Sequence, residues 1–168
     1  HPDLGADPIA AASLFVTAIQ SIVSRKIDPT QSAVISVTEF HAGTTWNVIP
    51  ETAYLEGTVR TFDPAVRAII RDRMCQAAEG IGLSQGVEIQ IDWLPGTPAT
   101  KNDPALVDQV RLAALSLSLK VGIVSPSMGG EDFAVYQESI PGVIWQIGVG
   151  HRNSLHHPGF TPDISGLL

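Results

Sequence analysis

The sequence predicts an α+β fold, and three observations lead to that prediction. Several stretches space their apolar residues three and four apart, as one face of a helix requires. Others alternate apolar and polar residues or are rich in β-branched ones, which is typical of strands. Hydrophobic residues make up 44% of the 168 residues and charged residues 16%. The chain therefore has enough apolar material for a core, and disorder is not expected.

Each predicted helix begins at an Asp-Pro pair. The Asp side chain can accept hydrogen bonds from the free N–H groups of a first turn, and Pro at the first helical position gives up no bond. The pairs at residues 7–8 and 63–64 introduce helices over 7–26 and 64–81, and we expect Gly80 and Gly82 to end the second. The pair at 103–104 introduces a third apolar stripe over residues 106–117.

Three strands are expected over residues 33–40, 53–61 and 87–93. The second alternates strictly, which places Arg60 on its wet face and Val59 on its buried face. The order helix, strand, strand, helix, strand is that of a ferredoxin-like split β-α-β-β-α-β fold whose first strand is missing. That arrangement leaves a sheet edge or a central slot open.

Residues 94–102, rich in Pro, Gly and Thr, form the clearest domain boundary. The tail beyond it has one predicted helix and two short apolar strands, expected over 120–124 and 143–149. These elements are too few for an independent core. They are typical of the end of a larger α/β domain.

Composition excludes several classes of partner. Acidic residues outnumber basic ones 17 to 10, a net charge of −7, which repels nucleic acid and anionic lipid. The expected strands also carry no aromatic pair for stacking RNA bases. The sequence contains no uninterrupted run of about 18 apolar residues, so we expect no membrane span. Cys75 is the only cysteine, so no intrachain disulfide can form. With no signal-like opening, we expect a cytoplasmic protein.

Two acid- and histidine-bearing stretches are candidate metal or pocket residues, and each has a plainer alternative. His156 and His157 are adjacent, so on an extended segment only one can face a given metal, and ordinary surface histidines are common. Glu131 follows a Gly-Gly pair. It suits a polar pocket, and the plainer alternative, which the stretch by itself favours, is the first turn of a helix.

Two further residues are candidates for binding a substrate. Asn47 follows a Gly-Thr-Thr-Trp turn, where it can cap the turn or present its amide to a ligand. Arg60 lies on the wet face of a strand, where a rigidly held guanidinium is suited to gripping a carboxylate with two parallel bonds.

Taken in order, five stretches resemble one enzyme family. They are DLGADPIAAA, AIQSIVSRKIDP, GTTWNVIPETAYLEGTVRTF, SMGGEDFAVYQESIPG and LHHPGFTPD. They resemble the dinuclear-metal amidohydrolases and peptidases of the aminoacylase type, in particular hippurate hydrolase and the plant auxin–amino-acid hydrolases. The resemblance covers essentially the whole chain.

The resemblance implies a zinc-peptidase-like α/β catalytic domain that holds two divalent ions (Zn, Mn, Co or Ni) and an inserted lid domain used for dimerisation. Residues 1–95 then correspond to the lid after its first strand, and residues 96–168 to the C-terminal part of the catalytic domain. The roles implied for single residues are a metal ligand for His156, a grip on the substrate's carboxylate for Asn47 and Arg60, and a loop bordering the metal pocket for Met128 and Glu131.

The resemblance also implies that the other metal ligands and a general-base glutamate belong to an N-terminal half, which we expect to precede residue 1. No catalytic residue is therefore assigned in this chain. We expect the longer parent to be a homodimer that hydrolyses N-acyl amino acids, hippurate-like or auxin-conjugate-like. This chain alone is expected to be inactive and to bind no metal tightly. The alternative is a dimerisation module without chemistry of its own.

Overall fold

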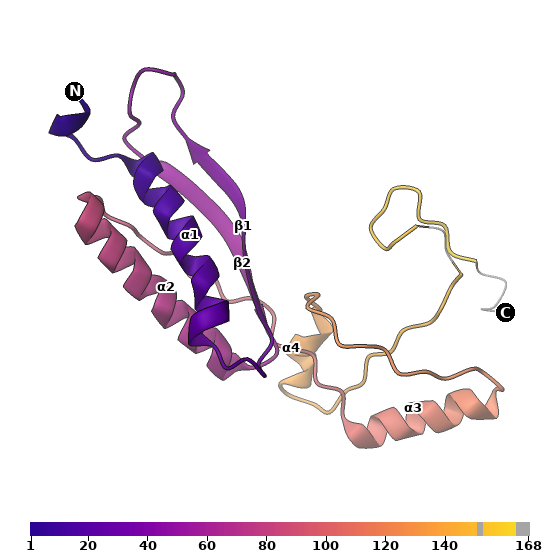
Figure 1. The fold of residues 1–168 in the computed structure, drawn as a ribbon. Coiled ribbons are helices and arrows are strands. Elements are labelled where there is room, and N and C mark those ends of the chain that lie inside the picture. The colour runs from indigo at the N-terminus through magenta and orange to yellow at the C-terminus, as the bar shows by residue number, and fades with distance from the viewer. Residues whose placement is uncertain (151–152, 164–168) are drawn as a thin grey trace. The chain divides into compact units, whose positions relative to one another are not determined.

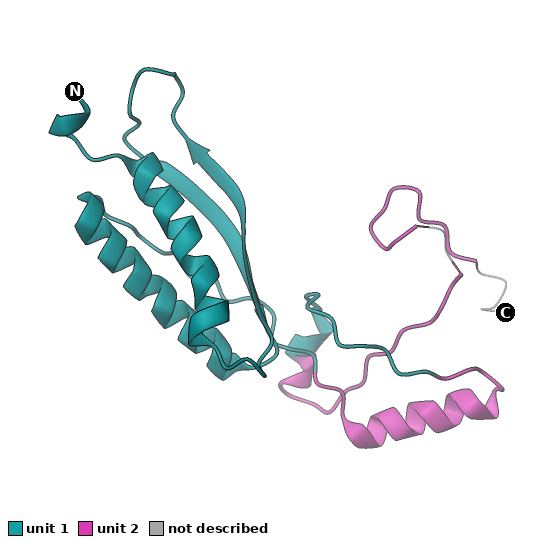
Figure 2. Cartoon of the chain, in the orientation of Figure 1, with its two compact units in different colours: residues 1–100, 122–135 teal, residues 101–121, 136–168 magenta. Residues whose placement is uncertain are grey.

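The computed structural model describes residues 1–150 and 153–163. Contacts divide the chain into two compact units, teal and magenta in Figure 2: residues 1–100 with 122–135, and residues 101–121 with 136–168. The assignment of residues 1–95 to a lid and 96–168 to a catalytic domain stays a prediction. The elements of Figure 1 are η1 (Pro2–Leu4), α1 (Pro8–Lys26), β1 (Ala33–Ala42), β2 (Ala53–Thr61), α2 (Pro64–Gln85), α3 (Pro104–Ser116) and α4 (Phe133–Gln137).

The three long helices begin at the Asp-Pro pairs, as predicted. Asp7 accepts bonds from two N–H groups of the first turn of α1, and Asp63 and Asp103 each accept one at the start of α2 and α3. Each aspartate thus satisfies donors that have no partner inside the helix. A capping side chain within three residues of the helix is a local signal, which is why the sequence reveals it.

The predicted end of α2 was wrong. The helix continues through Gly80 and Gly82 to Gln85, and it ends at Gly86, whose φ of 68° lies in the left-handed region and whose N–H bonds to the carbonyl of Gly82. Glycine adopts that conformation without steric penalty, whereas a glycine inside a helix only weakens it. Gly82 has a packing role instead, because a Cβ there would lie 2.8 Å from the carbonyl oxygen of Val87.

Strands β1 and β2 form an antiparallel hairpin. The register pairs Ala33 with Thr61 and Ala42 with Ala53, and a bulge between Val37 and Glu39 shifts it by one residue. Both predicted strands are confirmed, the first two residues longer than expected.

The core of the first unit lies between this hairpin and both of its long helices. Helix α1 packs against α2 and against both strands, and α2 packs against β2. Because Ile35, Val37, Leu55 and Val59 join this core while Val34, Tyr54, Glu56 and Thr58 are exposed, both helices cover the same face of the hairpin, as predicted (Figure 1). The buried members of the core are Phe15, Ile19, Ile22, Ile27, Ile35, Val66, Ile70 and Ala78.

Helix α1 is long and apolar enough, by length and composition alone, to cross a membrane. The core helix of a globular domain passes the same test. Phe15, Ile19 and Ile22 on its apolar stripe are buried in the core just described, which accounts for its hydropathy without a membrane.

Residues 87–93 form no strand, contrary to prediction, although their side chains alternate as expected. Residues 87, 89, 91 and 93 are half-buried and the residues between them are exposed, and Ile89 and Ile91 pack against the core. Within the described residues the only sheet is the two-stranded hairpin. Alternation predicts which side chains face the core, but a strand also needs a neighbour that supplies ladder hydrogen bonds.

The second unit contains α3, as predicted, but the strands expected over 120–124 and 143–149 are absent from the part of the chain that the structure describes. At Ile144 the reason is visible. Its carbonyl accepts a bond from the Asn102 side-chain amide (2.8 Å) and its N–H donates to the same side chain (2.9 Å). Both backbone groups of Ile144 are therefore satisfied without a partner strand.

Candidate functional site

Arg60 is the most informative of the predicted site residues. It lies next to the last residue of β2, on the hairpin face away from the helices, and it is half-buried. Its guanidinium forms no hydrogen bond or ion pair with the described part of the chain. Five donors fixed in a planar fork, partly shielded from water and without an acceptor, are suited to a carboxylate or a similar anion.

The loop that contains Met128 and Glu131 lies beside this guanidinium. A Cβ placed on Gly130 would stand 2.8 Å from Nη1 of Arg60 and 3.5 Å from Oγ1 of Thr97. Met128 is half-buried, whereas Glu131 is exposed and its carboxylate accepts a bond from the N–H of Phe133 (3.3 Å) at the start of α4. The structure thus brings Arg60 together with this loop. Glu131 is not in the first turn of α4, as the plainer alternative had it, because the helix begins at Phe133, two residues further on.

Asn47 lies far from Arg60 within the chain. It is exposed in the loop between β1 and β2, where its Oδ1 accepts a bond from the Thr45 hydroxyl (3.3 Å). Arg60 is at the other end of β2, seven residues beyond Ala53, which at ~3.3 Å per residue is about 23 Å of extended backbone. Figure 1 shows the loop and the far strand ends at opposite ends of the hairpin. The two side chains of one chain therefore do not grip the same carboxylate.

His156 is exposed in the second unit and has an unusual backbone conformation. It is the third residue of a turn that closes with a bond from the His157 N–H to the Ser154 carbonyl (3.2 Å), and its φ is 68°. A left-handed residue at that position of a turn is normally Gly or Asn. His157 has a local partner, since its Nδ1 accepts a bond from the N–H of Gly159 (3.0 Å). The two histidines are thus structurally distinct.

A metal centre is not assembled within the described residues. No group of three or more His, Cys, Asp or Glu side chains there could hold a metal ion. A dinuclear site needs several ligands in fixed geometry, so the side chains in the described ranges do not by themselves fit such a centre.

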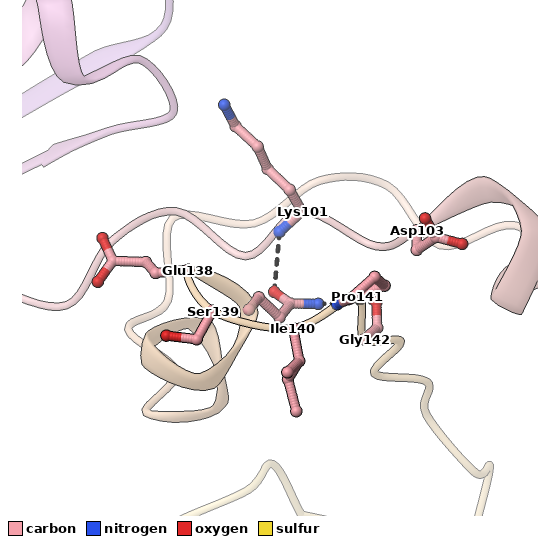
Figure 3. Close-up of a pocket in the computed structure, with 8 residues that line it drawn as sticks. Lys101, Asp103, Glu138, Ser139, Ile140, Pro141 and Gly142 are labelled. Carbon is pink, nitrogen blue, oxygen red and sulfur yellow. Dashed lines mark hydrogen bonds between the residues drawn. The ribbon is translucent and has the colours of Figure 1, made fainter.

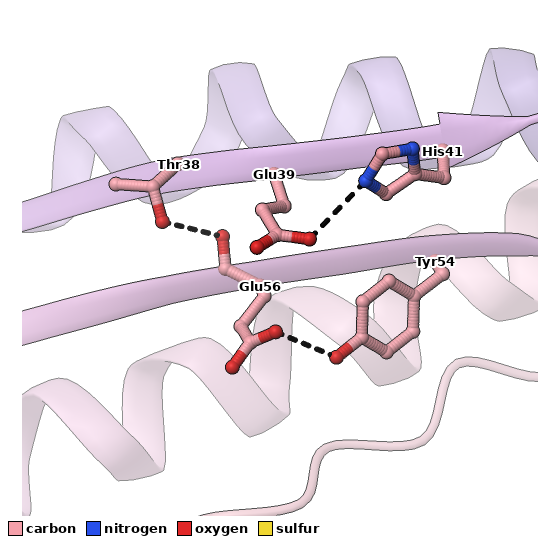
Figure 4. A network of polar contacts seen from close by, with 5 residues as sticks. All are labelled: Thr38, Glu39, His41, Tyr54 and Glu56. Atoms are coloured by element: carbon pink, nitrogen blue, oxygen red, sulfur yellow. Dashed lines mark hydrogen bonds and ion pairs between the residues drawn. The ribbon is translucent and has the colours of Figure 1, made fainter.

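A second polar cluster lies on the exposed face of the hairpin (Figure 4). His41 contacts Glu39 through Nε2 (3.1 Å), the Tyr54 hydroxyl donates to Glu56 (2.8 Å), and the His41 and Tyr54 rings stack with centroids 6.5 Å apart. The bond to Glu56, together with the negative charge of that carboxylate, raises the pKa of Tyr54 above its ordinary value of 10.0. Each polar group in the cluster has a neighbour on the same surface, so the cluster has no unpaired group aimed at a ligand.

The second unit contains a shallow hollow of about 330 Å³, lined by Lys101, Asp103 and residues 137–142. Figure 3 shows the bond from the Lys101 N–H to the Gln137 side chain (3.0 Å) that crosses it. The same side chain donates to the Gly142 carbonyl (3.0 Å). None of the predicted site residues lies in this hollow. We interpret the bonds of the Gln137 side chain as structural, because they connect the segment before α3 to the end of α4.

Sequence reasoning missed Gly130, which lies beside the Arg60 guanidinium, and the bonded pair Thr97 and Arg67. Gly130 belongs to a Gly-Gly pair, a signal of close backbone approach that could have been used. Arg67 donates from Nη2 to the Thr97 carbonyl (2.9 Å), across 30 positions of the sequence. No local pattern reveals a contact over that separation.

Residues 6–165 match the model of the peptidase family M20/M25/M40. The chain belongs to this family of peptidases, and the resemblance found in its motifs is confirmed. It is 42% identical over 166 residues to N-acetylcysteine deacetylase of Bacillus subtilis (strain 168), a match that covers 99% of this chain and 44% of that protein. It is 39% identical over 168 residues to N-acetyldiaminopimelate deacetylase of Streptococcus thermophilus (strain CNRZ 1066), covering 96% and 43%.

Two solved structures are also similar. One is the Bacillus subtilis YXEP protein, described as a dinuclear metal binding peptidase from the M20 family, with a TM-score of 0.80 at 39% identity over 94% of this chain and 41% of that one. The other is a putative aminohydrolase from methicillin-resistant Staphylococcus aureus, with a TM-score of 0.82 at 30% identity over 96% and 43%. The chain spans less than half the length of these relatives.

Proposed function

We propose that a longer protein containing this chain is a metal-dependent amidohydrolase that removes the acyl group from N-acyl amino acids. The observation that carries the proposal is the half-buried Arg60 guanidinium, which has no acceptor among the described residues and stands beside the Gly130 loop. N-acyl amino acids have a free carboxylate close to the amide that is cleaved. The relatives' names, N-acetylcysteine deacetylase and N-acetyldiaminopimelate deacetylase, support this substrate class.

Arg60 has the role of holding the substrate carboxylate. A bidentate pair between guanidinium and carboxylate fixes both the position and the orientation of the bound acid. It thereby places the amide at a defined distance from Arg60. Met128 and Glu131 border the bound substrate from the loop.

Asn47 acts on the substrate from a second copy of the chain. About 23 Å of extended strand separates its hairpin end from Arg60, so joint action on one substrate requires two copies. The exposed Trp46 (95%) and Val48 (62%) beside it are apolar surface that a neighbouring copy would cover. This makes the functional unit a homodimer, the commonest closed assembly.

The first unit is the lid of the enzyme, and its sheet is a ferredoxin-like one. In that fold the first strand lies between the third and the fourth, which here correspond to β2 and residues 87–93. Residues 87–93 alternate toward the core and have no ladder partner among the described residues, which suits such a gap. A strand from outside this chain would supply the backbone hydrogen bonds that both neighbours need.

His156 contributes one imidazole to the metal centre. Its φ of 68° is costly for a residue with a side chain, and strain of this kind is found where a side chain must be aimed. The two divalent ions, Zn, Mn, Co or Ni, require further ligands from outside this chain, as does the general base. The 168-residue chain alone is therefore inactive. Its remaining capacity is that of a dimerisation module.

The test uses the complete protein with each of the four metals added in turn. Release of free amino groups from N-acetylcysteine, N-acetyldiaminopimelate and hippurate is measured, beside matched amides that lack the carboxylate. We expect the acids to be hydrolysed with a far lower KM than the carboxylate-free amides, and Arg60→Ala should raise KM for the acids by roughly one to two orders of magnitude, because a charged hydrogen-bonded pair is lost. Arg25→Ala, an exposed arginine at the end of α1, is the control. Equal hydrolysis of acids and carboxylate-free amides would refute the role of Arg60.

A second assay separates the enzyme from the module. The purified 168-residue chain should show no hydrolysis with any metal, while light scattering should give the mass of a dimer. Turnover that persists through repurification and disappears in His156→Ala would show that the chain carries a complete site. A monomer at micromolar concentrations and above would contradict the module.

A further inference from the structure

The position of the Arg60 guanidinium depends on the missing side chain at Gly130. A Cβ at that position would stand 2.8 Å from Nη1 of Arg60, closer than such atoms approach, whereas a Cβ on Gly129 would meet only the Ser127 hydroxyl at 3.6 Å, an ordinary contact. The two glycines are therefore not equivalent. A side chain at the second would force the Arg60 guanidinium to shift, and a side chain at the first would not.

Thr97 borders the same space from another segment. Its hydroxyl oxygen lies 3.5 Å from the position of a Cβ on Gly130, and its backbone carbonyl accepts a bond from Nη2 of Arg67 (2.9 Å). Arg67 is the fourth residue of α2 and lies in its first turn, after the capping residue Asp63. The segment at residue 97 has no regular secondary structure, so this bond ties an irregular segment to a rigid helix.

The bond is made at an energetic disadvantage. Nε of Arg67 is buried and forms no hydrogen bond with the described residues. A buried donor without an acceptor destabilises the fold, and a residue that gives one bond at this expense is poorly explained by stability alone. Its partner Thr97 borders the space between Arg60 and Gly130, and we call the space bordered by these three residues the corner. The bond from Arg67 to Thr97 therefore suggests a positioning role.

We infer that Arg67 is a positioning residue for substrate binding. Its bond to the Thr97 carbonyl fixes the segment at residue 97, which borders the corner where Arg60 binds the substrate carboxylate. The inference rests on the proposed function, in which Arg60 binds that carboxylate. Arg67 itself need not touch the substrate. Its loss should let the segment at residue 97 move and leave the Arg60 guanidinium less well oriented.

The test compares Arg67→Met, Arg67→Lys and Arg71→Met in the complete protein. Met keeps the apolar stem of Arg67 and removes its donors, and Lys restores a donor that can reach the Thr97 carbonyl. Arg71 is exposed one turn further along α2 and serves as the control. Arg67→Met should raise KM for the N-acyl amino acid about tenfold with little change in kcat, since one charged bond that orients ground-state binding is lost. Arg67→Lys should recover much of the loss, and Arg71→Met should change nothing.

The readout that separates positioning from stability is a carboxylate-free substrate. For the matched amide without a carboxylate, KM should be the same in wild type and in Arg67→Met, although its value is high in both. A thermal unfolding temperature that falls with no change in KM for the acid would overturn the inference. An inactive wild type would instead overturn the proposed function, so the two failures are distinguishable.

A second pair of variants tests the corner if Arg67→Met does not fold. Gly130→Ala should raise KM for the acid, and Gly129→Ala should not. In an Arg60→Ala background the effect of Gly130→Ala should disappear, because the clashing guanidinium is gone. Additive effects of Arg60→Ala and Gly130→Ala would show that Gly130 does not act through the Arg60 guanidinium. That result would refute the inference that Arg60, Thr97 and Gly130 form one binding site.

Discussion

Glu39 and Glu56 face each other directly across the β1–β2 ladder. Like charges in this relationship destabilise a hairpin, and each carboxylate here has a compensating neighbour: His41 beside Glu39 (3.1 Å) and the Tyr54 hydroxyl beside Glu56 (2.8 Å). The neutral phenol can donate to Glu56, but the phenolate would add a third negative charge to the surface. The ionisation of Tyr54 therefore reports on the carboxylate pair.

The first prediction concerns this titration. The hydrogen bond to Glu56, the charge of Glu56 and more weakly that of Glu39 raise the pKa of Tyr54 above 10.0. A raised pKa in the folded state gives a stabilising contribution that is present below the ordinary value and is lost as pH rises through the raised one. In a Tyr136→Phe background, ultraviolet absorbance should show Tyr54 ionising above pH ~10. Glu56→Gln should lower the midpoint clearly, and Glu39→Gln should lower it less. An equal effect of the two substitutions would contradict the assignment.

The second prediction tests whether Asn47 and Arg60 act from different copies. Asn47→Ala and Arg60→Ala should each impair the complete protein. When the two variants are mixed under conditions that exchange subunits, about half of the dimers are mixed, and each of these has one intact site, so activity should return to about a quarter of wild type. Restoration is measured against the unmixed variants at the same protein concentration. Subunit exchange without any restoration would place both residues in one site of one chain, against the hairpin geometry.

The third prediction separates strain from function at His156. Because φ is 68° there, His156→Gly should relieve roughly 1 kcal/mol of backbone strain and leave the complete protein as stable as wild type or more so. The same substitution should lower activity, and the affinity for one of the two ions, by at least about tenfold, since one ligand is lost. His157→Ala, which removes the bond to the Gly159 N–H, should affect metal content far less. Stability is followed by denaturant titration and metal by elemental analysis. A destabilised His156→Gly that retains its metal would reverse the interpretation.

The fourth prediction concerns the close approach of the two strands at Gly57, which pairs with Val37 next to the bulge. A Cβ on Gly57 would clash with the Ser36 carbonyl oxygen and would lie 3.1 Å from the Val37 Cα. Since backbone cannot yield without breaking the ladder, Gly57→Ala should destabilise the protein by ~2 kcal/mol or more. Gly80→Ala, in a helix and with nothing within 4 Å, should instead stabilise it by ~0.5–1 kcal/mol. Urea denaturation measures both. A neutral Gly57→Ala would mean that the hairpin is not paired in this register.

The starts of the helices, the hairpin strands and the face that each presents to the core were predictable from the sequence. Asp63 caps α2 through a residue only two positions away, and the alternation around Val59 depends only on the period of a strand. Signals of this kind act over a few residues, so they can be recognised from residues that are neighbours in the sequence. The identity of Arg60, Asn47 and His156 as candidates came from motifs of the same short range.

Partnership between distant segments was decided only by the tertiary structure. Residues 87–93 have the side-chain pattern of a strand yet have no ladder partner among the described residues, and Ile144 is tied to an Asn102 side chain 42 positions away. The structure also separates Asn47 from Arg60, it places Gly130 beside the guanidinium, and it bonds Arg67 to Thr97. A hydrogen bond or a steric fit depends on which backbone or side chain arrives from elsewhere in the chain, and the local pattern of a segment contains no information about its partner.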